Sequence, residues 1–444
     1  MEEFLIKALQ LFLSLSILVI VHEFGHFIVA KLFKIRVEKF YLFFDPGFAF
    51  FRYKPKNSDT EFGIGWLPLG GYVKISGMID ESFDTAQMAQ EPKPWEFRTK
   101  PAWQRLLVMA AGAVFNFVLA WFIYCMMLFA WGDTYISTKD LKHGMTYSET
   151  AKEIGFQDGD KLISVDGEDF ILRGGILSVN DIMQFLNAEK VLVERDGKEV
   201  VIDIPTDFGE RIISSKKGIF QQRVLAVVDS VVENSIAAKA GIQKGDSIVK
   251  INDVEVASFS DFQQEVMKRE AESYTIQVYR DTSLITMADI SLKKGETMGV
   301  VVSSKDLIDA VKTDSYSFVA SLTAGGKLGY ETLKAYVSQM RFLFSKEGLS
   351  NLGGFGTMGS MFSPVWDWHY FWIMTAFLSI ALGFLNLVPI PMLDGGHIMF
   401  LLYEAITRRK PSDKFMEHAQ IIGLLIVLGL IIIANGNDII RAFF

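Results

Sequence analysis

The residues best placed to do chemistry are His22, Glu23 and His26, in the sequence His-Glu-Phe-Gly-His. Two histidines four positions apart project from one face of a helix, about one turn apart, and can bind one zinc ion. Glu23 then lies beside the metal without having to bind it. A carboxylate in that place can take a proton from a zinc-bound water, whose pKa the metal lowers to about 7. The motif therefore predicts peptide-bond hydrolysis, with Glu23 as the catalytic base.

The motif lies within an apolar run from about residue 8 to residue 30. Soluble zinc proteases carry the same pattern, and so short a pattern also occurs by chance. An ionisable residue at the centre of a membrane helix, however, costs roughly 2.5–3.5 kcal/mol on insertion scales and is rarely kept there without a function. The position of the motif therefore predicts a metal site inside a membrane.

The composition predicts both membrane-embedded and water-soluble parts, because half of the 444 residues are hydrophobic and 22% are charged. Four apolar stretches are long enough to cross a hydrocarbon layer of about 30 Å. They are residues 8–30, 104–130, 370–390 and 419–434. Basic residues follow the first stretch, precede the second and separate the last two, so the positive-inside rule places these ends in the cytoplasm. We therefore expect a polytopic α-helical membrane protein with four transmembrane helices, whose termini and central region lie on the outer side.

The charge and the cysteine content exclude several classes of protein. A net charge of −8 and a pI near 5.4, without a long basic stripe, argue against nucleic acid as a partner. The only cysteine, Cys125, lies in the second apolar stretch, so the central region folds without disulfides and the chain offers no cysteine-rich zinc site. We expect Cys125 to pack among the helices.

The central region contains a sequence repeat. Residues 151–167 match residues 237–253 at a constant offset of 86, with two glycines, a glutamine and an aspartate in register. Each copy predicts a short helix that ends at a glycine, a Gly-Asp turn and a β-strand, at residues 161–165 and 247–251. This pattern resembles the PDZ domain, whose members bind an extended peptide as an added strand. Two tandem α+β domains of this kind can bind peptide or exclude bulky substrates by size, and the sequence leaves both roles open.

A catalytic zinc with two histidine ligands needs a third protein ligand. The segment Asn386–His397, of sequence NLVPIPMLDGGH, offers Asp394 and His397, and the chemistry alone does not separate them. Its two prolines, Pro389 and Pro391, break a helix at the end of the third apolar stretch. Irregular backbone at membrane depth is tolerated where it lines a polar cavity, so we expect this segment at the metal.

Together, the His22–His26 motif, the Asn386–His397 segment and the PDZ-like repeats resemble the site-2 proteases, in particular their bacterial RseP-type branch. The resemblance implies an intramembrane zinc metalloprotease in which Asp394 is the third ligand and His397 starts a helix or packs. It implies substrates that span the membrane once and have already been shortened by another protease, such as an anti-sigma factor or remnant signal peptides. It also implies the bacterial inner membrane, with the termini and the PDZ-like domains on the periplasmic or extracellular side.

Two further segments look like parts of that family. Residues Glu61–Lys74 resemble its membrane-associated β-hairpin, whose free edge can pair with an unwound substrate. Residues Gly112–Asn116 resemble its GxxxN segment, in which a glycine permits close helix contact and an amide can hold the substrate or the developing oxyanion. We expect the substrate to contact four residues: Gly70, Gly71, Asn116 and Asn386.

These observations predict four parts of the chain. They are residues 1–131, with two transmembrane helices, the metal motif and the hairpin; 132–215, the first PDZ-like domain; 216–305, the second; and 306–444, with a surface helix at 315–344, a Gly-rich loop at 351–359 and two transmembrane helices. The alternative function is that of a membrane-anchored PDZ scaffold with a structural or inert metal site. Glu23 argues against this alternative, because an inert site needs no base.

Overall fold

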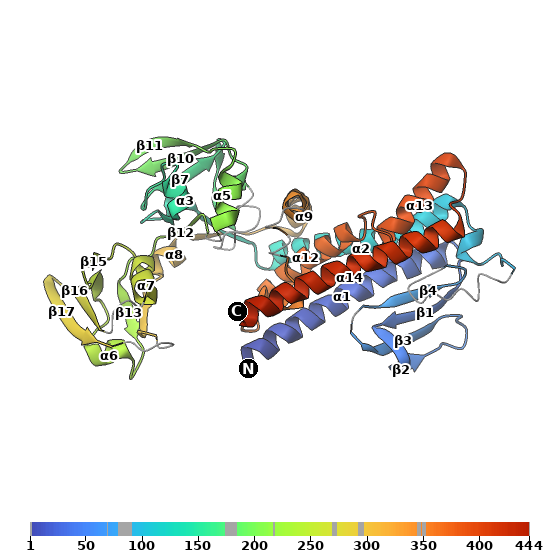
Figure 1. Ribbon diagram of the computed structural model, residues 1–444, viewed down its shortest axis with the longest axis horizontal. Helices are drawn as coiled ribbons and strands as arrows, with labels where there is room; N and C mark the ends of the chain where they lie inside the picture. The colour runs from blue at the N-terminus through green and yellow to red at the C-terminus, as the bar shows by residue number, and fades with distance from the viewer. Residues whose placement is uncertain are drawn as a thin grey trace. The chain divides into compact units, whose positions relative to one another are not determined.

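The computed structural model describes residues 2–68, 70–78, 91–173, 184–215, 218–268, 273–291, 297–343, 348 and 352–443. The chain divides into two compact units. We name them the helical unit, Met1–Gly132 with Ser315–Phe444, and the repeat unit, Asp133–Asp314. Figure 1 shows the elements of each unit, coloured along the chain. The two units are described separately below.

The helical unit is built from helices of very different length. They are α1 (Glu2–Leu32), α2 (Ala102–Ala130), α9 (Phe318–Leu343), α11 (Phe355–Ser360), α12 (Trp368–Leu385), α13 (Asp394–Thr407) and α14 (Asp413–Phe443), with a 3-10 turn, η1, at Phe97–Thr99. Four of these, namely α1, α2, α12 and the His418–Ala442 part of α14, are long and apolar enough to cross a membrane. They coincide with the four apolar stretches predicted from the sequence, and α9 coincides with the predicted surface helix.

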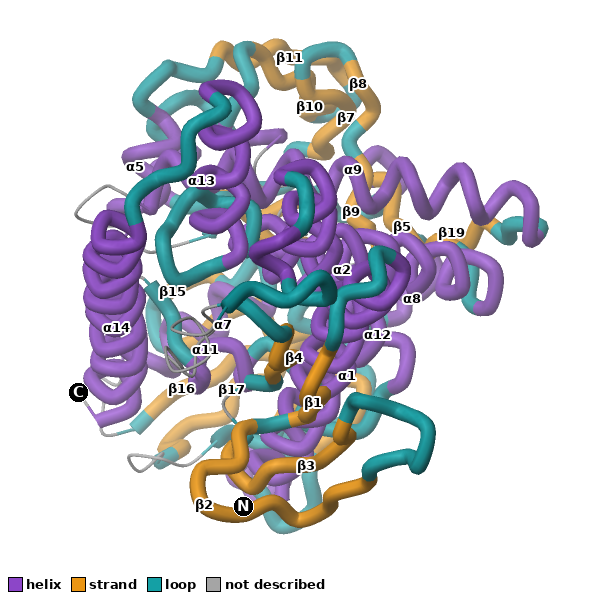
Figure 2. The backbone as a smooth tube through the Cα atoms, turned by 90° about the vertical axis from the view of Figure 1, so that its right-hand side faces the viewer, coloured by secondary structure: helices purple, strands orange, loops and turns teal. Residues whose placement is uncertain are grey.

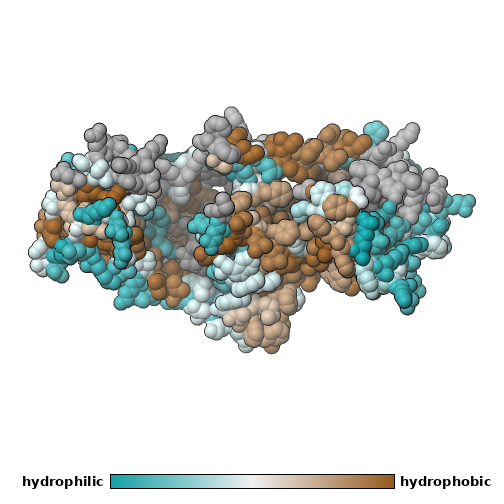
Figure 3. All heavy atoms as spheres, turned by 90° about the horizontal axis from the view of Figure 1, so that it is seen from below, coloured by the Kyte–Doolittle hydropathy of each residue, from teal (hydrophilic) through white to brown (hydrophobic). Residues whose placement is uncertain are grey.

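The long helices expose apolar side chains in a way that suits lipid rather than water. The apolar window of α14 is only 11% buried, against 44% for that of α2. On α14, Ile422, Leu425 and Ile432 are each more than half exposed. Figure 3 shows hydrophobic surface, in brown, over much of the region where the long helices lie. A soluble protein rarely exposes an apolar surface of this extent, so these helices fit a bilayer.

Helix α2 is the centre of the helical unit and packs against α1, α9, α12 and α13. Small residues set the closest approaches. A Cβ atom at Gly25 of α1 would lie 2.6 Å from the Ala111 carbonyl oxygen of α2, and one at Gly325 of α9 would lie 2.6 Å from Sγ of Cys125. Cys125 itself is 2% exposed, in agreement with the packing role expected for it. A larger residue at Gly25 would push α1 away from α2.

A four-stranded sheet follows α1 in the helical unit. Its strands are β1 (Val37–Leu42), β2 (Phe44–Tyr53), β3 (Glu61–Leu67) and β4 (Tyr72–Ile75), in the order β2-β3-β1-β4. Strand β1 pairs with β3 in parallel and with β4 antiparallel. In Figure 1, β4 is the strand of this sheet nearest to α1 and β2 the farthest from it, and Figure 2 shows the same strands, in orange, from another side. The fold therefore ends its sheet with β4, beside α1.

The hairpin predicted for Glu61–Lys74 is wrong, because β3 and β4 do not pair with each other but lie on opposite sides of β1. The alternating pattern of this segment correctly predicted extended chain. The strand that pairs with both, β1, lies before the predicted segment in the sequence. Because β1 lies between β3 and β4, these two strands do not form the hairpin that neighbouring strands often make.

The Gly-rich loop predicted at residues 351–359 is also partly wrong, because Phe355–Ser360 forms α11. The first turn of α11 is capped by a residue from α14. The backbone N–H groups of Gly354 and Thr357 each donate to Oδ2 of Asp438, at 3.0 Å. A carboxylate at a helix N-terminus satisfies amides that have no partner within the helix, which supports a helix in spite of its glycines.

The repeat unit consists of short elements. They are β5 (Asp133–Ser137), η2 (Thr138–Asp140), β6 (Met145–Tyr147), α3 (Glu149–Lys152), β7 (Lys161–Val165), β8 (Glu168–Asp169), β9 (Ile171–Arg173), β10 (Lys190–Arg195), β11 (Lys198–Asp203), α5 (Phe208–Ser215), β12 (Phe220–Gln222), β13 (Val228–Val231), α6 (Ile236–Ala240), β14 (Ser247–Ile251), β15 (Val254–Glu255), α7 (Phe259–Lys268), β16 (Tyr274–Arg280), β17 (Ser283–Ile290), β18 (Val300–Val302), α8 (Lys305–Asp309) and β19 (Val311–Asp314).

Each copy of the repeated sequence forms its own four-stranded sheet, and the two sheets have the equivalent strand order. The strand order is β8-β7-β10-β11 in one sheet and β15-β14-β16-β17 in the other. Strands β7 and β14 occupy the two ranges that the repeat predicts, residues 161–165 and 247–251. We name the part around β7, β8, β10 and β11 the first lobe, and the part around β14, β15, β16 and β17 the second lobe.

Each lobe has its own hydrophobic core. The core of the first lobe includes Phe220, because β12 pairs with β6, and it also includes Ala310, which follows the second lobe in the sequence. The core of the second lobe begins at Ala226 and reaches Met298. The predicted boundary between residues 215 and 216 stays a prediction.

Candidate metal centre

His22 and His26 lie on the face of α1 that packs against α2, and they are 9% and 7% exposed. Gly112 of α2 leaves the space that the two imidazoles occupy. A Cβ atom at Gly112 would lie 2.4 Å from Nε2 of His26 and 2.6 Å from Cε1 of His22. The two rings therefore rest against bare backbone of α2, from which any other residue would displace them.

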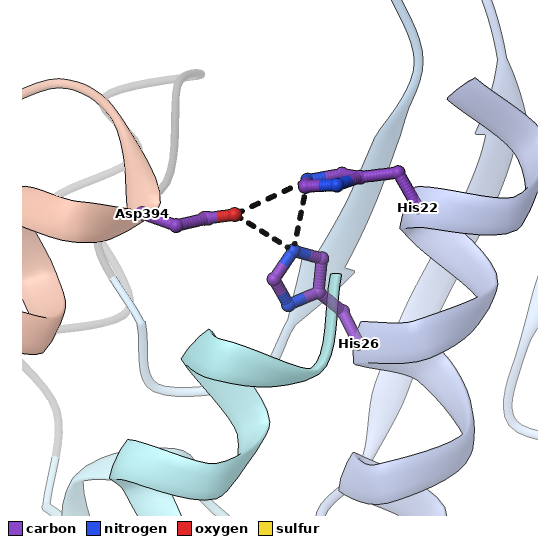
Figure 4. A group of neighbouring side chains, drawn as sticks. All are labelled: His22, His26 and Asp394. Atoms are coloured by element: carbon purple, nitrogen blue, oxygen red, sulfur yellow. Dashed lines mark hydrogen bonds and ion pairs between the residues drawn. The ribbon is translucent and has the colours of Figure 1, made fainter. Parts of the chain in front are cut away.

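The structure brings Asp394 to the two histidines. Asp394 is the first residue of α13, and its Oδ2 lies 3.1 Å from Nε2 of His22 and 3.2 Å from Nε2 of His26. The two Nε2 atoms are themselves 3.2 Å apart. Figure 4 shows the three side chains pointing toward a common point from α1 and α13. Of the two candidates for the third ligand, Asp394 is the one that reaches this point.

His397 lies near this group but outside it. Its Nε2 is 3.4 Å from Nε2 of Gln420 on α14, and its side chain lines the same cavity as the three converging residues. Among the described residues, the one cluster of three potential ligand atoms within 4.8 Å of one another is His22, His26 and Asp394.

The three converging atoms fit a zinc ion. Ligands about 2.0–2.1 Å from a tetrahedral zinc lie roughly 3.3 Å from one another, close to the spacing of the three atoms here. Oδ2 of Asp394 is buried and has no hydrogen-bond partner in the structure. A buried carboxylate oxygen without a donor is costly unless a cation faces it. Two imidazoles and one carboxylate are also a donor set typical of catalytic zinc.

The backbone of α2 fixes the proton position on His26. Nδ1 of His26 lies 2.8 Å from the Val108 carbonyl oxygen. A carbonyl oxygen only accepts, so Nδ1 carries the proton and donates to Val108. The Nε2 atom of His26 is then left with a free lone pair that faces the ligand cluster, as metal binding requires.

Asn116 of α2 is in place to do the same for His22. Its amide lies 3.2 Å from Nδ1 of His22, and Asn116 is fully buried. The amide oxygen of Asn116 has no partner on its present side. Turning the amide by half a rotation lets this oxygen accept the Nδ1 proton of His22 and leaves the His22 Nε2 lone pair for a metal. We assign Asn116 that orientation.

A cavity of about 530 Å³ lies beside the ligand cluster in the helical unit. It is lined by the three ligand candidates, by Glu23, and by all four residues of β4. Its other walls are largely apolar and include Phe44, Leu67, Met78, Met109 and Met392. The cavity thus joins the polar cluster to an edge strand and to an apolar wall.

The four residues predicted to contact the substrate do not share one environment. Gly71 lines the cavity, where a Cβ atom would lie 3.4 Å from Cγ of Glu23 and 2.6 Å from Cγ1 of Val19. Gly70 lies against the ring of Phe44 and is not part of the cavity wall. Asn386 caps the C-terminus of α12 and, like Asn116, does not line the cavity.

An ion pair near the cluster was not predicted from the sequence. Arg105 of α2, 7% exposed, donates to Glu404 of α13 at 2.5 Å and to the Lys100 carbonyl at 3.0 Å. Arg105 lies three residues before Val108, so the same part of α2 holds His26 of α1 and the helix that carries Asp394. The signal available in the sequence was a cation at the start of an apolar stretch, which the positive-inside rule already explained.

Comparison with known proteins gives a match over nearly the whole chain. The model of peptidase family M50 matches residues 10–430. Protease RseP of Yersinia pestis is 30% identical, over 96% of this chain and 97% of that protein. The regulator of sigma-E protease RseP of Escherichia coli strain K12 is 29% identical, over 99% of this chain and 100% of that protein. The regulator of sigma E protease of Haemophilus influenzae is 28% identical, over 97% of each chain.

The family match and the geometry of the helical unit point to the same activity. The matched range includes the His-Glu-Phe-Gly-His motif, Asp394 and the greater part of all four apolar helices. A zinc enzyme embedded among such helices hydrolyses peptide bonds within the membrane. The chain belongs to peptidase family M50, the site-2 protease family, and is a multi-pass intramembrane zinc metalloprotease of regulated proteolysis.

Proposed function

We propose that His22, His26 and Asp394 hold the zinc ion and that Glu23 is the catalytic base, in cleavage of proteins that span the membrane once. The observation that carries this proposal is the convergence of three ligand atoms at 3.1–3.2 Å from one another, beside a cavity that Glu23 lines. A bound zinc supplies Lewis-acid polarisation of the attacking water and of the scissile carbonyl.

The side chains around the metal have separate tasks in this mechanism. Glu23 accepts a proton from the attacking water and afterwards donates it to the leaving amine of the cleaved bond. His26 is held by its bond to Val108, and His22 by its contact with Asn116, so neither ring turns during the reaction. The amide of Asn116 therefore acts on His22, and the role of substrate contact proposed for Asn386 rests on its place at the end of α12.

Strand β4 supports a way to hold the substrate. A helical peptide bond is enclosed in the hydrogen bonding of its own helix, so the substrate must be extended before it can be cleaved. All four residues of β4 line the cavity, and β4 is the last strand of its sheet. An extended substrate can therefore add beside β4, with Glu23 and the ligand cluster within the same cavity. Gly71, immediately before β4, keeps the approach to Glu23 free of a side chain.

The remaining assignments rest on the relatives. The names of the Haemophilus influenzae and Escherichia coli proteins refer to control of a sigma factor, and by analogy an anti-sigma factor that spans the membrane once, or a remnant signal peptide, is the proposed substrate class. The inner membrane is the proposed location, with both termini and the repeat unit on the outer side. The two lobes are proposed to be PDZ-like domains that select substrates, by binding peptide or by excluding bulky outer domains.

The decisive experiment compares Glu23→Gln with the unchanged protein on a tagged single-span substrate whose outer domain has been truncated. We expect cleavage to fall by about 10²–10⁴-fold, the usual contribution of a general base, while the bound zinc is retained. The matched control is Glu3→Gln, the same change in the first turn of the same helix, which should cleave normally. Normal cleavage by Glu23→Gln with zinc bound would disprove the assignment and favour a scaffold with an inert metal site.

A further inference from the structure

Met392 has a backbone conformation that its residue type disfavours. Among the described residues, nine that are not glycine have a positive φ angle. Seven of these are Asn, Asp, Lys or Arg, and the other two are Phe43 and Met392, at φ 67° and 89°. Asn and Asp adopt this region more readily than other side chains, and bulky apolar residues adopt it rarely. Such a residue is usually kept for what its side chain does.

The turn around Met392 would suit a glycine better. The N–H of Leu393 donates to the Ile390 carbonyl at 3.1 Å, which closes a four-residue turn with Pro391 second and Met392 third. Proline in the second position and a positive φ in the third define a type II turn, in which the third residue is normally glycine. Met392 thus occupies a position where glycine carries no strain.

Two helices pack closely against the backbone of the turn at Pro391. A Cβ atom at Gly396 of α13 would lie 2.6 Å from Cα of Pro391, and one at Gly423 of α14 would lie 1.7 Å from the Pro391 carbonyl oxygen. The turn is therefore held between two helices through backbone contacts at Pro391. These contacts keep the strained conformation in place, and a glycine at residue 392 would satisfy them equally well.

Met392 lines the cavity beside the ligand cluster, two residues before Asp394. Met78, Met109, Phe44 and Leu67 continue the apolar wall of the same cavity. Methionine is unbranched and polarisable, so it adapts to apolar groups of different shape. Of the two apolar residues at positive φ, Met392 is the one that lies in the wall beside the proposed metal ligands.

We infer that Met392 is a specificity-determining residue, which forms the wall of an apolar subsite for the substrate side chain next to the cleaved bond and limits the size of that side chain. This inference rests on the proposed function, because it assigns the cavity beside Glu23 to the substrate. The competing explanation is that Met392 only fills space in the loop, in which case its size has no effect on substrate choice.

The test uses the full-length enzyme in detergent and a single-span substrate whose cleaved bond has first been located by mass spectrometry. The residue next to that bond is varied among Ala, Leu and Phe, and kcat/KM is measured for each. We expect Met392→Gly to raise the Phe-to-Ala ratio of kcat/KM by roughly tenfold, the discrimination typical of a change in apolar pocket volume. Met392→Ala should have a smaller effect in the same direction, and Met392→Leu should keep the ratio of the unchanged enzyme.

Two controls separate the possible causes. Asp281→Gly relieves a positive φ of 53° in the turn between β16 and β17 of the repeat unit, and it should leave the ratio unchanged. Glu23→Gln reports on the proposed function, because normal cleavage by that variant would refute the mechanism whatever Met392 does. An unchanged ratio in folded Met392→Gly and Met392→Ala, or an equal loss of cleavage of all three substrates, would overturn the specificity role while leaving the mechanism standing.

Discussion

The two units of this protein each bury carboxylates, but they treat them in opposite ways. In the repeat unit, Asp160 and Asp246 are 1% and 0% exposed, and each accepts two hydrogen bonds from an arginine, Arg195 or Arg280, at 2.7–2.8 Å. Each also accepts a hydrogen bond from a backbone N–H, that of Gln157 at 2.9 Å and that of Gln243 at 2.8 Å. In the helical unit, Oδ2 of Asp394 is buried without a hydrogen-bond donor.

The difference distinguishes buried carboxylates that stabilise the fold, Asp160 and Asp246, from one that we assign to metal binding, Asp394. The arginines of the repeat unit also donate to the carbonyls of Gly155 and Gly241, so each buried carboxylate joins a sheet to the turn that ends a helix. Such a network is complete without any ligand. Asp394 and the two imidazoles present potential metal-binding atoms to one another, as expected of a group that a cation completes.

The largest effect expected from this comparison is that of Asp394→Ala. We expect the purified variant to lose its zinc and its cleavage activity below detection, because two imidazoles alone make an incomplete catalytic site. Its thermal unfolding in the absence of zinc should be close to that of the chelator-treated unchanged enzyme. Zinc per molecule, measured by elemental analysis, and cleavage of a single-span substrate test this. A variant that keeps one zinc per chain would show that the ligand set is wrong.

Asp246→Asn should show the opposite pattern. We expect the second lobe to lose about 2–3 kcal/mol of stability, because hydrogen bonds to charged groups contribute about 1.5–3 kcal/mol each and the amide offers Arg280 no opposite charge and one acceptor oxygen in place of two. Hydrogen exchange of β14 and β16 in the full-length protein measures this, with the first lobe as internal reference. Zinc content should not change, and a change in zinc content would contradict the distinction drawn here.

Asp246 should also make the stability of the second lobe depend on pH. Burial raises the pKa of Asp246, but the bonds from Arg280 and from the Gln243 N–H outweigh burial, so its folded pKa lies below the ordinary value. A carboxylate of this kind stabilises the fold above its unfolded pKa, near 4, and loses that contribution as the pH falls through its folded pKa. The protection of the second lobe, meaning its exchange rate relative to that of unfolded chain at the same pH, should therefore fall below about pH 4, and Asp246→Asn should remove this dependence.

The smallest effect expected is that of Asn116→Ala, which removes the orienting partner of His22. We expect zinc affinity to fall by about 10–100-fold, the usual effect of losing a group that orients a metal ligand. Competition with a fluorescent chelator measures the affinity. Asn116→Asp, whose oxygen can still accept from Nδ1 of His22, should restore much of it. An unchanged affinity in Asn116→Ala would show that the backbone of α2 alone orients the rings.

The sequence predicted those features that depend on local spacing. His22, Glu23 and His26 share one helical turn, the apolar stretches determine their own helices, and the strands of the repeat alternate within a few residues. Features that depend on distant pairing were less accessible. The residues alone left Asp394 and His397 as equal candidates, because only the fold of the chain brings α13 to α1.

The two errors at the sheet and at α11 have the same physical origin. Strand β3 pairs with β1 in place of the expected β4. Helix α11 forms where a loop was predicted because Asp438 of α14, 81 residues after Thr357, caps it. A local pattern reports the preference of a segment for helix or strand, but it does not contain the partner that completes its hydrogen bonds. Family resemblance favoured Asp394 over His397, whereas the contact of Asn116 with His22 required the structure.

The bare backbone at Gly112 also bears on metal selectivity. Because both imidazoles rest against α2, they have no room to move outward and lengthen their bonds to an ion. Calcium takes six to eight oxygen ligands at about 2.3–2.6 Å, and magnesium keeps most of its water. A compact group of two nitrogens and one carboxylate suits neither of them, so a missing side chain on one helix helps to decide which cation another helix can hold.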